Sequence, residues 1–277
     1  MPIVDRSEVR GNLRTNRPDC YTRSLRVRVR ENARTKHWTE VLDRAFLICV
    51  TSPHRTRSMR NVLPRRGRDL NPSIHIEFSS VSKTAAILRR GPTKWVRLLA
   101  WNIASDTISP GSWFHGRIYD DGCSVSPDGN LFAYFATKYG GHKTREVDYA
   151  WTAISKLPWL TALALWPQSE TWGGRAKFVD NQTLIIDCPH WEELRTKDKL
   201  PKGFTVYPRW IGRGAPDQNL PPTQSCSAWF NGSNGIDQTG RAFEYEDGKL
   251  VRDGRLIVDL GAMTPDPQPS PPSAKTW

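Results

Sequence analysis

The chain has 277 residues, 38% of them hydrophobic, which is enough to bury a sizeable core in one large domain or two smaller ones. Lys and Arg outnumber Asp and Glu by 40 to 28, and the net charge of +12 raises the question of a nucleic-acid partner. The longest early apolar run, Ala45–Val50, is too short for a secretory signal or a membrane span. We therefore expect a cytoplasmic protein with no membrane partner.

Residues 1–69 carry almost all of the excess charge. They hold 17 Lys and Arg against 7 Asp and Glu, whereas residues 70–277 hold 23 against 21. One helix is predicted here, over Thr39–Val50, because apolar residues recur at helical spacing after a threonine that can cap it. The remainder predicts a disordered arm, or a non-native extension ahead of a start at Met59. Nucleic-acid binding through this Arg-rich arm is an alternative function, although aromatic residues for base stacking are scarce.

Residues 70–262 have short apolar runs separated by Gly, Pro, Asn and Asp, which predicts an all-β domain. Three hairpins are predicted where two such runs flank a turn. They pair Ile74–Phe78 with Thr84–Leu88, Ala176–Val179 with Thr183–Ile186, and Gly235–Gly240 with Arg241–Tyr245. Further strands are predicted over Lys94–Trp101, Leu160–Trp166 and Phe204–Tyr207, the last within a Pro- and Gly-rich loop. One short helix is predicted over Tyr149–Leu157.

A fourth hairpin carries the clearest turn signal of the chain, Ser126-Pro-Asp-Gly-Asn130. Proline presets φ, aspartate bonds to the local backbone, and glycine accepts a positive φ. The following run, Leu131–Ala136, is apolar on both of its alternating faces, so it predicts a strand sandwiched between two neighbouring sheets.

The segment Val125-Ser-Pro-Asp-Gly-Asn-Leu-Phe-Ala-Tyr134 resembles the WD40-like propeller repeat of the TolB type. Equivalent positions of the four hairpins, Phe78, Val125, Phe178 and Ile236, are 47, 53 and 58 residues apart, and propeller blades span about 40–50 residues. The resemblance implies a scaffold with a binding surface and carries no catalytic residues. We predict a β-propeller-like array of about four antiparallel sheets, open or incomplete, with a β-sandwich as the alternative.

Two short segments contain residue types found in catalytic or ligand-binding sites. His115, in the aromatic cluster Trp113–Arg117, could pair with Asp120 or Asp121 in a hydrolase, but the chain lacks a nucleophile motif, and the two aspartates also fit a turn. Gly140–Lys143 lacks the spacing of a phosphate-binding loop and predicts a connection. We assign no catalytic, cofactor-binding or metal-binding residue.

The five cysteines are widely spaced, which predicts reduced thiols rather than a zinc site. Residues 263–277 are Pro-rich and predict a tail that packs no core and is extended or disordered. The leading functional hypothesis is a protein-interaction scaffold without catalysis, binding another protein through loops at the rims of the sheets. The residues expected to contact the partner are Trp113, His115, Trp172, Trp191 and Trp210.

Overall fold

The computed structural model describes residues 71–91, 93–138, 149–168, 170–188, 196, 198–212, 218–224 and 226–277. All of them belong to one compact unit. The expectations for residues 1–69, for the helix over Thr39–Val50, for Gly140–Lys143 and for Trp191 lie outside the described residues.

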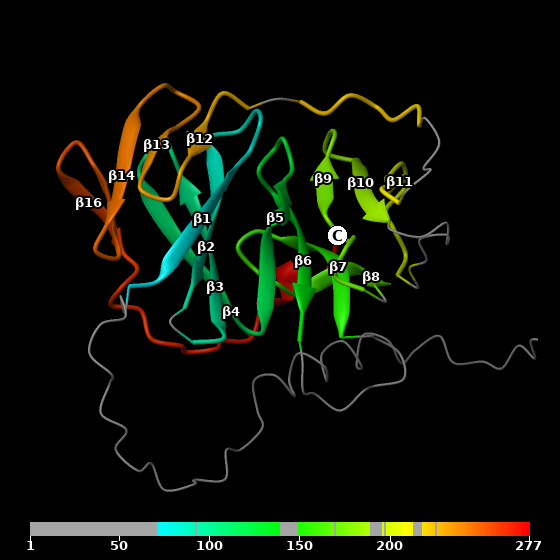
Figure 1. Ribbon diagram of the computed structural model, residues 1–277, viewed down its shortest axis with the longest axis horizontal. Coiled ribbons are helices and arrows are strands. Elements are labelled where there is room, and N and C mark those ends of the chain that lie inside the picture. Colours follow the sequence, from blue (N-terminus) through cyan, green and yellow to red (C-terminus); the bar gives the residue numbers. More distant parts are fainter. Residues whose placement is uncertain are drawn as a thin grey trace, which may run out of the picture. The chain divides into compact units, whose positions relative to one another are not determined.

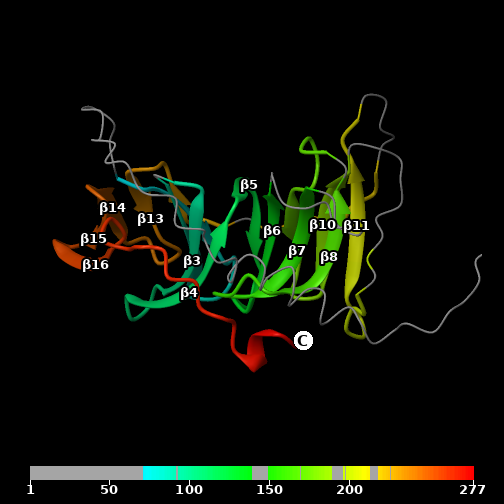
Figure 2. The ribbon, with the colours of Figure 1, turned by 90° about the horizontal axis from the view of Figure 1, so that it is seen from below.

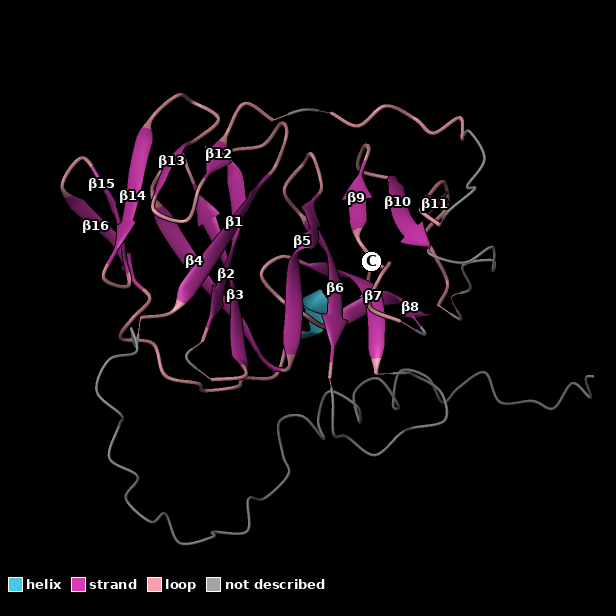
Figure 3. Ribbon diagram, viewed as in Figure 1, coloured by secondary structure: helices cyan, strands magenta, loops and turns pink. Residues whose placement is uncertain are grey.

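The described part of the chain is all-β, as predicted, and its sixteen strands form four sheets (Figures 1 and 3). Sheet A contains β1 (Ser73–Phe78), β2 (Thr84–Arg90), β3 (Trp95–Asn102) and β4 (Thr107–His115), in that order. Sheet B contains β5 (Arg117–Val125), β6 (Leu131–Thr137), β7 (Ala150–Lys156) and β8 (Ala162–Gln168), again in order. Each is an antiparallel meander, and none of the four sheets closes on itself.

Sheets C and D complete the unit. Sheet C contains β9 (Ala176–Phe178), β10 (Thr183–Cys188) and β11 (Thr205–Trp210), and β11 pairs with β10 in parallel. Sheet D contains β12 (Trp229–Phe230), β13 (Asn234–Ile236), β14 (Ala242–Glu246), β15 (Lys249–Arg252) and β16 (Arg255–Asp259). The only helical element of the described residues is the single 3-10 turn η1 (Pro272–Ala274). The four hairpins predicted from the sequence are confirmed as the pairs β1–β2, β5–β6, β9–β10 and β13–β14.

Three buried apolar clusters fix the spatial order of the sheets as D, A, B, C. One cluster lies between A and B, a second between A and D, and a third between B and C. None of the three joins sheet C to sheet D in the described part of the chain. Viewed from below, the sheets follow one another in this order across the picture (Figure 2). The chain visits A, B and C in turn and then crosses to D beside A.

The first strand of each sheet lies at the same side of the array, which we call the inner edge. β1 contacts both β5 and β12, and β5 contacts β9. In sheets A and B the opposite edge strand, β4 or β8, leads directly into the first strand of the next sheet. This pattern of connections fits an open propeller-like array and also a stack of β-sandwiches.

The Ser-Pro-Asp-Gly turn is one of four hairpin turns that lie side by side, and together we call them the turn row: residues 79–83, 126–130, 180–182 and 237–240. Hydrogen bonds connect them in the spatial order of the sheets. They run from the Gln238 Nε2 group to the Ser82 carbonyl (2.9 Å), from the Ser79 hydroxyl to the Pro127 carbonyl (2.7 Å), and from the Asp128 amide to Asn181 Oδ1 (2.9 Å). Gly129 has φ of +79°, and a Cβ there would lie 2.4 Å from Ser82 Oγ. The turn at residues 79–83 of sheet A packs directly against Gly129, so this position has no room for a side chain.

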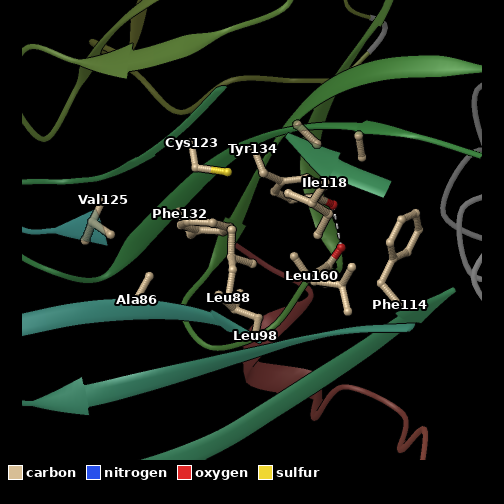
Figure 4. Close-up of a cluster of buried hydrophobic side chains, with 13 residues drawn as sticks. Ala86, Leu88, Leu98, Phe114, Ile118, Cys123, Val125, Phe132, Tyr134 and Leu160 are labelled. Atoms are coloured by element: carbon tan, nitrogen blue, oxygen red, sulfur yellow. Dashed lines mark hydrogen bonds between the residues drawn. The ribbon is translucent and has the colours of Figure 1, made fainter. Parts of the chain in front are cut away.

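Strand β6 confirms the prediction of a two-sided strand. Its side chains alternate between the A–B cluster and the B–C cluster, to which Tyr134 and Ala133 respectively belong. Figure 4 shows the A–B cluster, with side chains from β2 to β6 and Leu160 enclosed between the two sheets. The Tyr134 hydroxyl donates a 2.7 Å hydrogen bond to the Leu160 carbonyl inside this cluster, drawn as a dashed line in Figure 4. Burial raises the pKa of Tyr134 well above its ordinary value, so the phenol stays protonated and can donate.

Replacing Tyr134 by Phe is expected to lower the free energy of unfolding by about 1–3 kcal/mol, because the Leu160 carbonyl keeps its buried position without its donor. Urea unfolding followed by circular dichroism measures the change. Tyr207→Phe, at an exposed tyrosine of β11, is the matched control and should leave the midpoint in place. An equal shift in both variants would contradict the role assigned to the buried bond.

Three predictions of local structure are wrong. Tyr149–Leu157 is not a helix: β7 covers most of it, because Trp151, Thr152 and Ile154 suit a strand packed on both faces. Asp120 and Asp121 lie within β5, in an irregular stretch of the strand, and do not form a turn between elements.

The third correction concerns the Pro-rich tail, which is extended but packed. Ala274 is buried, the Thr161 and Ser270 hydroxyls are 2.7 Å apart, and Lys156 Nζ donates to the Ser273 carbonyl at 2.9 Å. Proline-rich chain loses little entropy on being held in place, so a few such contacts are enough to fix it.

Candidate functional site

An irregularity in β5 brings four charged side chains together at the inner edge of sheets A, B and C. Tyr119 pairs with Phe135 and Ser124 pairs with Ala133, so the four residues 120–123 lie opposite a single residue of β6. Gly122 permits this, since a Cβ there would lie 3.0 Å from the Cβ of Phe135. A bulge of this kind redirects side chains, and bulges are frequent next to functional sites.

The bulge directs its two aspartates to two different arginines. Asp120 Oδ2 lies 2.6 Å from Arg90 Nη1 at the end of β2. Asp121 Oδ2 accepts from Arg175, just ahead of β9, at 2.9 Å from Nε and 2.7 Å from Nη2. Both carboxylates are thus engaged by guanidinium groups, an arrangement typical of structural ion pairs.

His115, the proposed base of the hydrolase hypothesis, lies at the end of β4. Its exposed imidazole packs on Trp95, with 4.9 Å between ring centroids. Trp113, two residues earlier, is only 3% exposed, and the guanidinium carbons of Arg89 and Arg97 lie 5.4 and 5.1 Å from its ring centroid. Trp113 is therefore buried, and its ring offers no surface to a partner.

The other predicted partner-binding residues divide by exposure. Trp172, in the connection between β8 and β9, is 77% exposed and is the most exposed large apolar side chain of the described residues. Trp210, at the end of β11, is half-buried, and its backbone N–H and C=O both bond to the side chain of Gln218. The structure places these two residues on different elements of the chain.

Sequence reasoning missed four further exposed aromatics, one of which is Tyr149 at 40%, and one pocket. Trp229 is 46% exposed and Tyr207 38%, and Trp277 is 37% exposed although its ring contacts Phe204. A pocket of about 250 Å³ opens at the ends of sheets A and B that lie opposite the turn row. It is lined by Ser73, Arg90, Gly91, Thr93, Val96, Gly116 and Arg117. Alternation along Thr205–Trp210 could have indicated the exposure of Tyr207. Nothing local marks the pocket, because its lining comes from β1, from the β2–β3 connection with the strand ends beside it, and from the β4–β5 connection with the start of β5.

The described cysteines are free thiols, and two of them are buried. Burial, together with the nearby charges of Glu77 and Asp120, raises the pKa of Cys123 well above its ordinary value. Burial raises the pKa of Cys188 to about 12. Neither thiol is ionised at neutral pH, so neither can act as a nucleophile there.

Within the ranges that the structure describes, no cluster of His, Cys, Asp and Glu is suited to hold a metal ion. No helix in those ranges combines the length and the apolar character needed to cross a membrane. Comparisons of the chain with protein-family models, with curated proteins and with solved structures found no match.

Proposed function

We propose that this chain is a protein-interaction scaffold without catalysis, which binds another protein through loops at the rims of its sheets. The observation that carries the proposal is the 77% exposure of Trp172. Leaving a side chain of this size in water forgoes much of the free energy that its burial would contribute. Trp is also the residue type most enriched in the hot spots of protein interfaces.

The segment that carries Trp172 is held firmly in place, which supports a binding role. The Gly174 amide donates to the Asp187 carbonyl at 2.8 Å, and the Gly174 carbonyl accepts from the Thr152 hydroxyl at 2.7 Å. The next residue, Arg175, forms the ion pair with Asp121. A partner that covers Trp172 would therefore meet a surface whose backbone is already ordered, and preorganisation of this kind lowers the cost of binding.

The edge strands opposite the inner edge disfavour pairing with a strand of the partner. We therefore place the binding surface on the loops at the rims of the sheets. The strands opposite the inner edge in sheets A, B and C each contain one proline, namely Pro110 in β4, Pro167 in β8 and Pro208 in β11. In sheet D the corresponding strand, β16, pairs irregularly with β15. Proline removes a backbone donor and a bulge interrupts a ladder, so all four of these edges resist the addition of a strand.

The same proposal includes a propeller-like arrangement related to the TolB-type repeat. It is supported by the shared inner edge, by the connections from the far edge of one sheet to the inner edge of the next, and by the turn row. A cytoplasmic location, also proposed, is supported by the free thiols of Cys123 and Cys188. The alternative of nucleic-acid binding rests on residues 1–69, because the rest of the chain has nearly balanced charge.

Trp172→Ala is expected to weaken binding of the partner about thirtyfold, the loss typical of a hot-spot tryptophan, without changing the melting temperature. The measurement is quantitative affinity capture from native extract, followed by titration of the captured protein against both forms of the chain. Leu256→Ala, at an exposed leucine of β16, is the matched control and should bind like the wild type. Unchanged capture by the Trp172 variant would remove the basis of the proposal.

A further inference from the structure

The pocket at the ends of sheets A and B opposite the turn row has a lining suited to an anion. Arg90 and Arg117 contribute guanidinium groups, and Ser73 and Thr93 contribute hydroxyls. The lining contains no carboxylate; the nearest identified acid is Asp120, which contacts Arg90 through Nη1 alone. The remaining nitrogens of Arg90 stay available as donors, so the pocket combines two cations with two neutral hydrogen-bonding groups.

Arg117 is held in a defined position without an acidic partner. Its guanidinium carbon lies 4.3 Å from the centroid of the Tyr119 ring, which is itself stacked on Phe135 at 4.9 Å. The side chain is exposed, and no ion pair of the described residues includes it. A guanidinium that is oriented by stacking, and that forms no ion pair within the described residues, is well suited to bind a planar or tetrahedral oxyanion.

The size of the pocket restricts what can enter. Its volume of about 250 Å³ lies below the range of about 300–1,000 Å³ that is usual for drug-sized ligands and cofactors. A single acidic or phosphorylated side chain fits this space. Recognition of such groups by clusters of arginine is a recurring mode of peptide binding.

We infer that this pocket binds a small oxyanion, the carboxylate or phosphoryl group of a side chain on the protein partner. The inference rests on the proposed interaction function and narrows it, since the partner would present an acidic or phosphorylated residue to Arg90 and Arg117. Trp172, on the connection between sheets B and C, would contact a separate part of the same partner.

The test uses inorganic phosphate and acetate as probes, with the full chain, at constant ionic strength maintained with chloride. Backbone amide resonances of Gly91, Gly116 and Arg117 are followed by NMR during each titration. We expect these resonances to shift and saturate with at least one of the two anions, and the one that binds more tightly indicates the chemistry of the partner's group. Arg117→Ala should weaken that binding about tenfold or more, because it removes charge-assisted hydrogen bonds.

Two further variants control the result. Arg117→Lys keeps the charge but loses the planar pair of donors, so it should bind between the wild type and Arg117→Ala. Arg255→Ala, at an exposed arginine of β16, should bind like the wild type. Linear shifts without saturation, shifts spread over unrelated amides, or equal weakening by Arg117→Ala and Arg255→Ala would overturn the inference. Because this experiment needs no partner, its failure would leave the result for Trp172 untouched, and a negative result at Trp172 would leave this one untouched.

Discussion

Asp237→Asn is expected to lower the free energy of unfolding by about 3 kcal/mol, a large part of the 5–15 kcal/mol that holds a typical domain together. Asp237 begins the turn between β13 and β14, and its side chain is fully buried between sheets D and A. Its Oδ2 lies 2.6 Å from Nη2 of Arg252, a side chain that is only 2% exposed. Removing the carboxylate leaves a buried guanidinium with one charged partner fewer.

The expected loss of about 3 kcal/mol lies at the lower end of the range for breaking a buried ion pair, because Arg252 keeps other interactions in the variant. Its Nη1 lies 2.5 Å from Asp106 Oδ1, and its guanidinium carbon lies 4.8 Å from the ring centroid of Trp101. Arg241 also approaches Asp237, with 3.6 Å between Nε and Oδ2. The network therefore connects three charged residues on the sheet D side, Asp237, Arg241 and Arg252, to Asp106 and Trp101 on the sheet A side.

Urea unfolding of wild type and variant measures this loss. Glu244→Gln, an exposed acid-to-amide change in the same sheet, is the matched control and should leave the unfolding midpoint unchanged. A variant as stable as the wild type would show that the buried ions contribute nothing net, as happens in some proteins.

The same network predicts how stability depends on pH. Burial acts to raise the pKa of Asp237, but hydrogen bonds from the Thr239 hydroxyl and amide, from the Arg241 amide, and the charge of Arg252 outweigh it and lower that pKa. A carboxyl whose pKa is lower in the folded state stabilises the fold above its ordinary value of 3.8, and this contribution is lost as the pH falls through the lowered value. Wild type should thus lose stability relative to Asp237→Asn as the pH is lowered through this window.

The hairpins could be predicted because their signals are local. Ser-Pro-Asp-Gly at residues 126–129 specifies a turn by its own chemistry, and the apolar runs on either side specify two strands. The turns of sheets A, C and D were recognised from their position between apolar runs, although their residues differ. What the sequence alone did not show is that the four turns bond to one another, because residues such as Ser82 and Gln238 are far apart in the chain.

Strand β7 shows where local reasoning fails. Tyr149–Leu157 has a length and a terminal proline that suit a short helix, but between β6 and β8 the same residues are buried on both sides. Tertiary packing decides in favour of the strand, as it regularly does over weak intrinsic preferences. The bulge in β5 is similar, since Asp120 and Asp121 look like turn residues until Arg90 and Arg175 are seen to hold them.

The candidate sites also differ in how far the sequence alone could predict them. Trp172 could be chosen from sequence as an aromatic residue in a connection, but the same reasoning selected Trp113, and only the packing of sheet A separates the exposed ring from the buried one. The pocket around Arg117 could not be predicted, because its lining comes from β1, from the β2–β3 connection and from the β4–β5 connection. Exposure and convergence are properties of the fold rather than of a motif.

Gly111→Ala is expected to cost about 3 kcal/mol or more, the upper range for overpacking a closely packed site. Gly111 lies in β4, where the backbone approaches the connection between β7 and β8. A Cβ at Gly111 would lie 1.9 Å from the Pro158 carbonyl oxygen and 2.6 Å from the Pro158 Cβ. Because the obstructing atoms belong to the backbone and to a proline ring, no side chain can rotate away, and sheets A and B must separate locally.

Separation would also break the bonds that join β4 to this connection. The Ser112 amide donates to the Pro158 carbonyl at 3.2 Å, and the Ser112 hydroxyl accepts from the Leu160 amide at 3.1 Å. Gly261→Ala is the matched control: its backbone also avoids positive φ, and the nearest atom to a new Cβ is Asp259 Oδ1, at the end of a side chain, at 3.3 Å. Thermal and urea unfolding should show a large loss for Gly111→Ala and a small change for Gly261→Ala. Similar stabilities for the two variants would mean that sheets A and B are not in direct backbone contact at this point. That result would contradict the face-to-face packing on which the scaffold proposal depends.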